Sequence, residues 1–119
     1  MKIIRGHLYI VDFNPRVHTK PGKLRPAVVV QSDLVNEAGY PSTIVIPTTS
    51  RVVEDAGFLR LHLPKGTCGL EKESDLLMGQ LIAVANISFK KDLGALPSEL
   101  FKELESRLVG LLDLSTYIR

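Results

Sequence analysis

The stretch Arg25-Pro26-Ala27-Val28-Val29-Val30-Gln31 decides the fold, because an arginine and a proline lead at once into a β-branched apolar run. Such a run is typical of a strand buried in a sheet. A second apolar run, residues 43–46, ends in the polar cluster Pro47-Thr48-Thr49-Ser50. A rigid sheet can aim side chains at the ends of neighbouring strands toward one point. The pattern indicates an anion site, and phosphate is the favoured anion.

The composition is that of one globular domain spanning residues 1–119, with 45% hydrophobic and 24% charged residues. No apolar run could cross a bilayer, and the start of the chain does not resemble a signal peptide, so we expect a cytoplasmic protein with no membrane partner. Cys68 is the only cysteine, and the three histidines have no paired spacing. We therefore expect neither a metal nor another cofactor.

Positive charge gathers in residues 14–24, although the net charge of the chain is only +2. The segment contains two prolines, no carboxylate and almost no apolar side chain, so we expect a surface loop. Two interpretations stay open, a lid over a charged ligand and a solvated connection. Its basic side chains, with the arginine that follows, are Arg16, His18, Lys20, Lys23 and Arg25.

Hydrophobic periodicity predicts strands followed by a helix. In residues 58–63 the leucines share one face, which leaves Arg60 and His62 either to contact a ligand or to face solvent. A helix is predicted from Ser98 as N-cap, because the leucines that follow recur at helical spacing. The fold class is therefore mainly β (α+β), a small antiparallel sheet or barrel. The predicted strands are residues 7–13, 27–31, 43–46, 58–63 and 76–84, with a short helix at 33–37.

Four blocks in this order and spacing resemble the MazF/PemK family of toxins, which are mRNA interferases of toxin–antitoxin pairs. The resemblance covers nearly the whole chain and ends with a leucine-rich helix. The blocks are Arg5-Gly6-His7-Leu8-Tyr9-Ile10-Val11-Asp12-Phe13-Asn14-Pro15, then Lys23 through Gln31, then Val45-Ile46-Pro47-Thr48-Thr49-Ser50, then Gly69-Leu70 with Ser74 and Gln80.

The resemblance implies an SH3-like antiparallel barrel of about five to seven strands with short helices and a C-terminal helix. It implies a homodimer that cleaves single-stranded RNA at specific sequences without a metal. It also implies a cognate antitoxin, an acidic and partly disordered chain that competes with RNA for the basic side chains.

Carried over residue by residue, the resemblance implies that Arg25 is the catalytic arginine and Thr49 the catalytic threonine, with Thr48 as the alternative one place away. Metal-free cleavage can use the 2′-hydroxyl as nucleophile, and a guanidinium suits the charge that develops on phosphorus. The residues expected to bind RNA are Arg16, Lys20, Lys23, Thr48, Ser50, Ser74 and Gln80.

One departure from the family pattern concerns the proton acceptor. Several members have a carboxylate in the first long loop, whereas residues 14–24 contain none. His18 could replace it, since an imidazole titrates near neutral pH. The alternative is that His18 is a solvated loop residue.

Two other functions stay open. CcdB-like toxins share the barrel and poison gyrase by binding protein, and fold alone does not separate the two activities. The pair of Arg25 and Thr49 favours the ribonuclease. The missing loop carboxylate favours a silent RNA- or protein-binding module.

Overall fold

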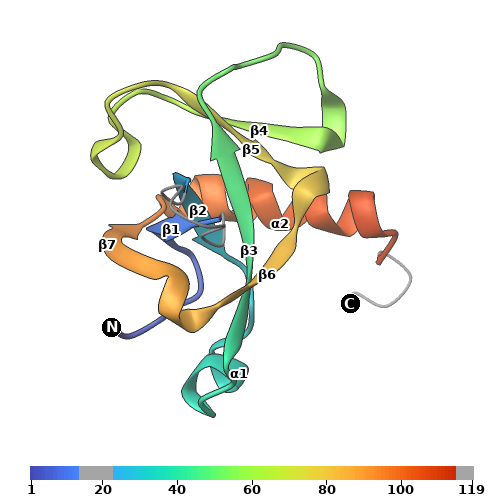
Figure 1. The fold of residues 1–119 in the computed structure, drawn as a ribbon. Coiled ribbons are helices and arrows are strands. Elements are labelled where there is room, and N and C mark those ends of the chain that lie inside the picture. Colours follow the sequence, from blue (N-terminus) through green and yellow to red (C-terminus); the bar gives the residue numbers. More distant parts are fainter. Residues whose placement is uncertain (14–22, 115–119) are drawn as a thin grey trace.

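The computed structural model describes residues 1–13 and 23–114, a mainly β structure with one long helix (Figure 1). His18, Arg16 and Lys20 lie outside these residues. The strands are β1 (His7–Asp12), β2 (Leu24–Val29), β3 (Ser42–Thr49), β4 (Arg60–Leu63), β5 (Ser74–Leu77), β6 (Ile82–Ala85) and β7 (Phe89–Ala95). The helices are α1 (Asp33–Glu37) and α2 (Ser98–Leu112), and the 3-10 turns are η1 (Gly57–Leu59), η2 (Thr67–Gly69), η3 (Met78–Gln80) and η4 (Asn86–Ser88).

The strands pair antiparallel in the order β4-β5-β3-β2-β1-β7, and β6 pairs with β3 as well. Strand β3 runs through the middle of the molecule in Figure 1 and contacts three other strands. Its C-terminal end lies beside β5, with Thr49 opposite Asp75, while Pro47 lies opposite Ala27 of β2. The polar end of β3 and the entrance of β2 are therefore neighbours. The seven-stranded antiparallel sheet is confirmed, and its closure into a barrel stays a prediction.

The predicted single strand over residues 76–84 is wrong, because η3 divides it into β5 and β6. Both halves pair with β3, β5 at Thr48 and Thr49 and β6 at Ser42 to Val45. The chain must step past the part of β3 that contains Pro47, which has no N–H to donate to a ladder. Strand β7 was not predicted, because its sequence FKKDLGA mixes charges and a glycine and has no clear alternation.

Buried side chains form two clusters, one on each face of the curved sheet. Leu8 and Val28 lie in the larger cluster, to which α2 contributes the buried Leu104. Tyr9 and Val11 point the opposite way, into the smaller cluster. Alternation along β1 thus fills both cores, and this is why the strand is apolar on both faces.

Helix α2 begins at Ser98, one residue earlier than the predicted N-cap would place it. Pro97 is the residue that precedes the helix, and no side chain caps it, so Ser98 as N-cap is wrong. The Pro97 carbonyl accepts from the Phe101 N–H at 3.1 Å, and Glu99 in the first turn suits the helix dipole. None of the helices among the described residues is long and apolar enough to span a membrane.

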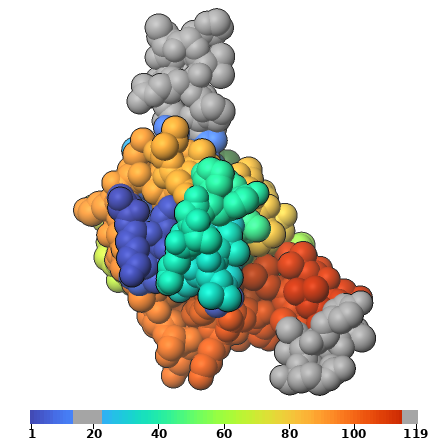
Figure 2. Space-filling view, turned by 90° about the horizontal axis from the view of Figure 1, so that it is seen from below, coloured from blue at the N-terminus to red at the C-terminus, as the bar shows by residue number. Residues whose placement is uncertain are grey.

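Arg5 ties the N-terminal segment to two helices. Its backbone N–H donates to Asp33 at 2.8 Å, and the space-filling view shows the N-terminal segment lying beside the α1 region (Figure 2). Its guanidinium pairs with Glu105 at 3.0 Å and lies 4.7 Å from the ring centre of Phe101. Arg5 therefore connects the N-terminal segment to both α1 and α2.

Candidate nucleic-acid interface

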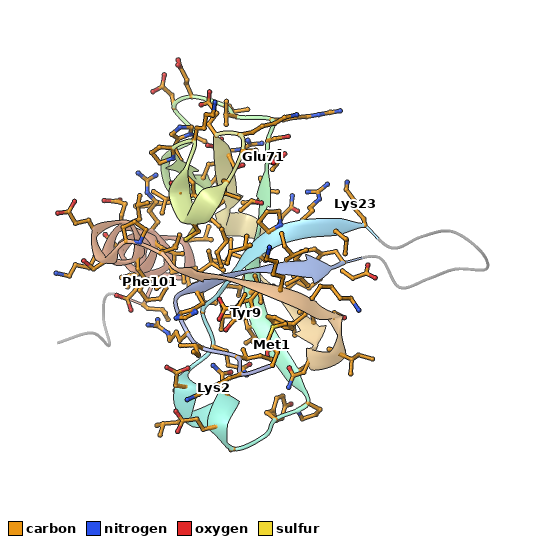
Figure 3. All side chains as sticks on the ribbon, turned by 90° about the vertical axis from the view of Figure 1, so that its left-hand side faces the viewer. Met1, Lys2, Tyr9, Lys23, Glu71 and Phe101 are labelled. Atoms are coloured by element: carbon orange, nitrogen blue, oxygen red, sulfur yellow. The ribbon has the colours of Figure 1, made fainter. Side chains whose placement is uncertain are left out.

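A pocket of about 610 Å³ opens where the start of β2 meets the end of β3; we call it the β2–β3 pocket. The segment before β5 forms its third side. Figure 3 labels Lys23 at the start of β2 and Glu71 on the loop that precedes β5. The lining residues are Lys23, Leu24, Arg25, Pro26, Thr48, Thr49, Ser50, Arg51, Leu70, Glu71, Lys72 and Ser74.

The strand pairing explains why Arg25 lies at the mouth of this pocket. Arg25 is paired with Val11 of β1, and Pro26 holds the residue before it in an extended conformation. Among the described residues the guanidinium makes one long hydrogen bond, from Nη1 to the Thr48 carbonyl at 3.4 Å. Most of its N–H donors are therefore available to an anion.

The two threonines at the end of β3 differ in their contacts. The Thr48 side chain is buried, and its hydroxyl donates to the Pro26 carbonyl at 2.9 Å. Thr49 is only partly buried, and its hydroxyl accepts from the Arg51 N–H at 3.2 Å, which leaves the hydroxyl proton available for a ligand. Thr48 thus connects β3 to β2, whereas Thr49 can donate into the pocket.

A neighbouring pocket of about 450 Å³ contains Gln80, and we call it the Gln80 pocket. Lys23 and Arg25 line both pockets, so the two are continuous around these cations. Ser74 is buried, and its hydroxyl donates to the Lys72 carbonyl at 3.3 Å. The structure therefore brings together the predicted site residues that it describes, namely Lys23, Arg25, Thr48, Thr49, Ser50, Ser74 and Gln80.

Sequence reasoning missed Arg51, Glu71 and Lys72, which also line the β2–β3 pocket. Arg51 follows the polar cluster directly, and Glu71-Lys72 follow the quoted Gly69-Leu70, so adjacency to both blocks was the available signal. Four cations, Lys23, Arg25, Arg51 and Lys72, face a single carboxylate among the described lining residues. This charge distribution suits a polyanion.

In the described part of the chain, no group of three His, Cys, Asp or Glu side chains could hold a metal ion. Cys68 lines neither pocket, and its thiol donates to the Ala95 carbonyl at 3.3 Å. Burial, together with the charge of Asp92, raises the pKa of this thiol. A protonated thiol is a poor nucleophile, so Cys68 is not a candidate for the chemistry.

Comparison with known proteins agrees with this fold. Residues 4–112 match the family described as PemK-like, MazF-like toxin of type II toxin–antitoxin system. Endoribonuclease MazF6 of Mycobacterium tuberculosis (strain ATCC 25618 / H37Rv) is 28% identical over 114 residues, which cover 96% of this chain and 100% of that protein. Endoribonuclease MazF2 of Mycobacterium bovis has the same identity and coverage.

Solved structures share the fold. MazE–MazF of Deinococcus radiodurans (Form-III) has a TM-score of 0.76 at 23% identity, covering 95% of this chain and 98% of that chain. A mycobacterial endoribonuclease in complex with its cognate antitoxin has a TM-score of 0.73 at 13% identity, covering 93% of this chain and 95% of that chain. The resemblance seen in the sequence is confirmed: the chain belongs to the PemK-like, MazF-like toxin family of type II toxin–antitoxin systems.

Proposed function

We propose that this protein is a metal-independent endoribonuclease toxin that cleaves single-stranded RNA at specific sequences and so blocks translation. The observation that carries the proposal is the convergence of Arg25 and Thr49, from the ends of two paired strands, on one pocket lined by four cations. Homologues that match 96% of the chain at 28% identity are endoribonucleases, which supports the same activity here.

Arg25 stabilises the negative charge that develops on the scissile phosphate. A guanidinium binds two phosphate oxygens at once and stays protonated throughout the reaction, which suits it to this role more than to proton transfer. Thr49 donates its hydroxyl to the same phosphate while the Arg51 N–H holds its oxygen in place. Thr48 supports this arrangement through its bond to Pro26.

The 2′-hydroxyl of the nucleotide before the scissile bond is the nucleophile, and its attack gives a 2′,3′-cyclic phosphate and a 5′-hydroxyl. A proton acceptor is needed, and two candidates exist. His18, from the basic loop, lies outside the described residues, and Glu71 lines the pocket itself. The pH–rate profiles of His18→Ala and Glu71→Gln separate them, because loss of the true acceptor removes the limb of the profile that reports its ionisation.

The rest of the pocket binds the RNA strand around the scissile phosphate. Lys23 lies where the two pockets meet and neutralises phosphate charge. Polar side chains near base edges, above all Gln80, contribute to sequence preference. We assign RNA binding to Lys23, Ser50, Ser74 and Gln80, together with Arg16 and Lys20 of the basic loop.

A second copy of the chain covers an exposed apolar strip that begins beside the Gln80 pocket. Leu81 and Ile82 line that pocket and are 37% and 47% exposed. Phe58 and Leu59 of η1, each 56% exposed, lie on an element that contacts both η3 and α2. Exposed apolar side chains on neighbouring elements are typical of an interface, and two-fold dimers are the commonest assembly.

The antitoxin partner is an acidic segment that occupies the cationic pockets in place of RNA. The Deinococcus radiodurans structure contains MazE with MazF, and the mycobacterial endoribonuclease is in complex with its cognate antitoxin. Carboxylates on a flexible chain compete with RNA phosphates for Lys23, Arg25 and Arg51.

The test is cleavage of a long single-stranded RNA by the purified protein in EDTA. We expect cuts at a short recurrent sequence and products with 2′,3′-cyclic phosphate ends. We expect no cut where the nucleotide before the scissile bond lacks its 2′-hydroxyl. A matched double-stranded RNA serves as the control and should remain intact. Intact single-stranded RNA would reject the ribonuclease, and a block of gyrase turnover in the same preparation would assign the protein to the gyrase poisons.

A further inference from the structure

Asp75 is a buried carboxylate beside the proposed active site that takes no part in the pocket lining described above. It lies in the middle of a rung of the sheet, opposite Thr49 of β3 on one side and His62 of β4 on the other. Figure 1 shows β4 and β5 beside the C-terminal end of β3. Its side chain is 2% exposed, so its charge must be satisfied inside the protein.

Two of the three contacts that Asp75 makes with described residues lead to the segment that follows Thr49. Its Oδ2 accepts from the Val53 N–H at 2.9 Å and from Arg60 Nη1 at 3.1 Å. The same Arg60 nitrogen donates to the Arg51 carbonyl at 2.7 Å. His62 contacts the other carboxylate oxygen through Nδ1 at 3.1 Å.

The backbone of Arg51 is thereby held at both ends. Its N–H donates to the Thr49 hydroxyl at 3.2 Å, and its carbonyl accepts from Arg60. Arg51 and Thr49 both line the β2–β3 pocket, whereas Asp75 and Arg60 line a different pocket of about 580 Å³. Asp75 in one pocket is therefore connected, through Arg60, to the backbone of Arg51 in the other.

Asp75 is ionised in this environment. Burial raises the pKa of its carboxyl group, but hydrogen bonds from the Val53 N–H, His62 and Arg60 outweigh burial and hold the pKa below its usual value. A buried ion pair is a weak source of stability compared with apolar packing. What this pair determines is the geometry of residues 51–53.

We propose that Asp75 is a positioning residue for RNA cleavage, which acts through Arg60 to hold Arg51 and the Thr49 hydroxyl in place at the β2–β3 pocket. The inference rests on the proposed ribonuclease function. A positioning role predicts an effect that charge alone would not produce. Removing the negative charge of Asp75 near a cationic RNA site should by itself strengthen RNA binding, whereas loss of the positioning contacts should slow cleavage.

The experiment compares Asp75→Asn with Asp92→Asn as the matched control. Asp92 also pairs with a histidine, His7, at 3.1 Å and accepts a backbone N–H, that of Gly94, at 2.8 Å, but it lines neither site pocket. We measure single-turnover cleavage in EDTA and the Kd for a 2′-O-methyl RNA that cannot be cut. We expect Asp75→Asn to slow cleavage by about 10- to 100-fold without weakening RNA binding, and Asp92→Asn to leave both unchanged.

A double-mutant cycle with Thr49→Val tests the route of the effect, because the route ends at the Thr49 hydroxyl, which this variant lacks. If Asp75 acts by holding that hydroxyl in place, adding Asp75→Asn to Thr49→Val should slow cleavage by less than about threefold more. Unchanged cleavage by folded Asp75→Asn, or full additivity with Thr49→Val, would overturn the proposal.

Two further outcomes are distinguishable. If Asp75→Asn does not fold, Arg60→Gln replaces it in both measurements, because this variant leaves Asp75 its contacts with Val53 and His62. RNA left intact by the unaltered protein would reject the ribonuclease itself, whereas an active parent with an equally active Asp75→Asn variant rejects only the positioning role.

Discussion

Replacing Thr48 and Thr49 one at a time by valine should separate a structural hydroxyl from a catalytic one. Valine keeps the branched shape of threonine and removes only the hydroxyl group. In Thr48→Val the bond to the Pro26 carbonyl at 2.9 Å is lost. A buried hydrogen bond contributes about 0.5 to 1.5 kcal/mol net, so the free energy of unfolding should fall by about 1 kcal/mol.

Cleavage by Thr48→Val should change little. Arg25 contacts the backbone carbonyl of Thr48 and not its side chain, and the substitution leaves that carbonyl in place. The rate should therefore fall by less than about tenfold, which corresponds to roughly 1.4 kcal/mol.

Thr49→Val should show the opposite pattern. The lost contact is the partly exposed one with the Arg51 N–H at 3.2 Å, so the free energy of unfolding should fall by less than about 1 kcal/mol. The phosphate loses a donor in the transition state, which costs on the order of 100-fold or more in rate, about 2.7 kcal/mol. Thr49→Ser restores the hydroxyl and should restore most of the rate.

Urea unfolding and single-turnover cleavage of a labelled RNA in EDTA measure the two effects separately. The reasoning fails if Thr48→Val cleaves about 100-fold more slowly than the parent while Thr49→Val stays active. It also fails if Thr49→Ser is as slow as Thr49→Val, because the hydroxyl would then be irrelevant to the rate.

Three predictions concern stability. Leu104→Ala, in the core under α2, should lower the free energy of unfolding in urea by about 2–5 kcal/mol, whereas Leu34→Ala at an 83% exposed site should change it by less than about 0.5 kcal/mol; equal effects would contradict the core assignment. The pKa of Asp75 is lowered in the folded protein, so its ionised form stabilises the fold fully above the ordinary value of 3.8, and this stabilisation is lost as the pH falls through the lowered pKa. In urea titrations below pH 3.8, the free energy of unfolding of Asp75→Asn should therefore fall less steeply with pH than that of the parent. Parallel curves would refute this. Burial raises the pKa of Tyr9, opposed by the Ile4 N–H and assisted by Asp92 and Asp33, so the stabilisation from its neutral form is complete below pH 10.0 and is lost as the pH rises through the raised pKa. In Tyr9→Phe the free energy of unfolding should therefore fall less steeply at alkaline pH. An unchanged slope would count against this.

The fold was predictable where one short segment carries its own signal. The β-branched run after Pro26 and the leucine spacing of α2 each indicate one structure, and both elements are present. The break between β5 and β6 was not predictable from residues 76–84, because it depends on how two strands share β3 around Pro47. Such long-range pairing leaves no periodicity in the sequence.

The candidate site was predictable only where its residues lie beside a segment that carries its own signal. Arg25 and the threonines follow strand ends, and neighbouring strand ends meet at one place. Arg60 and His62 were expected either to contact a ligand or to face solvent; His62 is exposed, as expected, but both side chains also contact Asp75. That cluster joins three strands at one rung, and only the register of the sheet brings its members together.

The central role assigned to Arg25 is tested most directly by the single-turnover cleavage rate of Arg25→Ala in EDTA, with Lys91→Ala on β7 as a control that removes the same charge outside the site pockets. Loss of a donor that stabilises the transition state should slow cleavage by about 100-fold or more, and the control should cleave at the parent rate. Cleavage by folded Arg25→Ala at the rate of Lys91→Ala would contradict the assignment of Arg25 to the scissile phosphate.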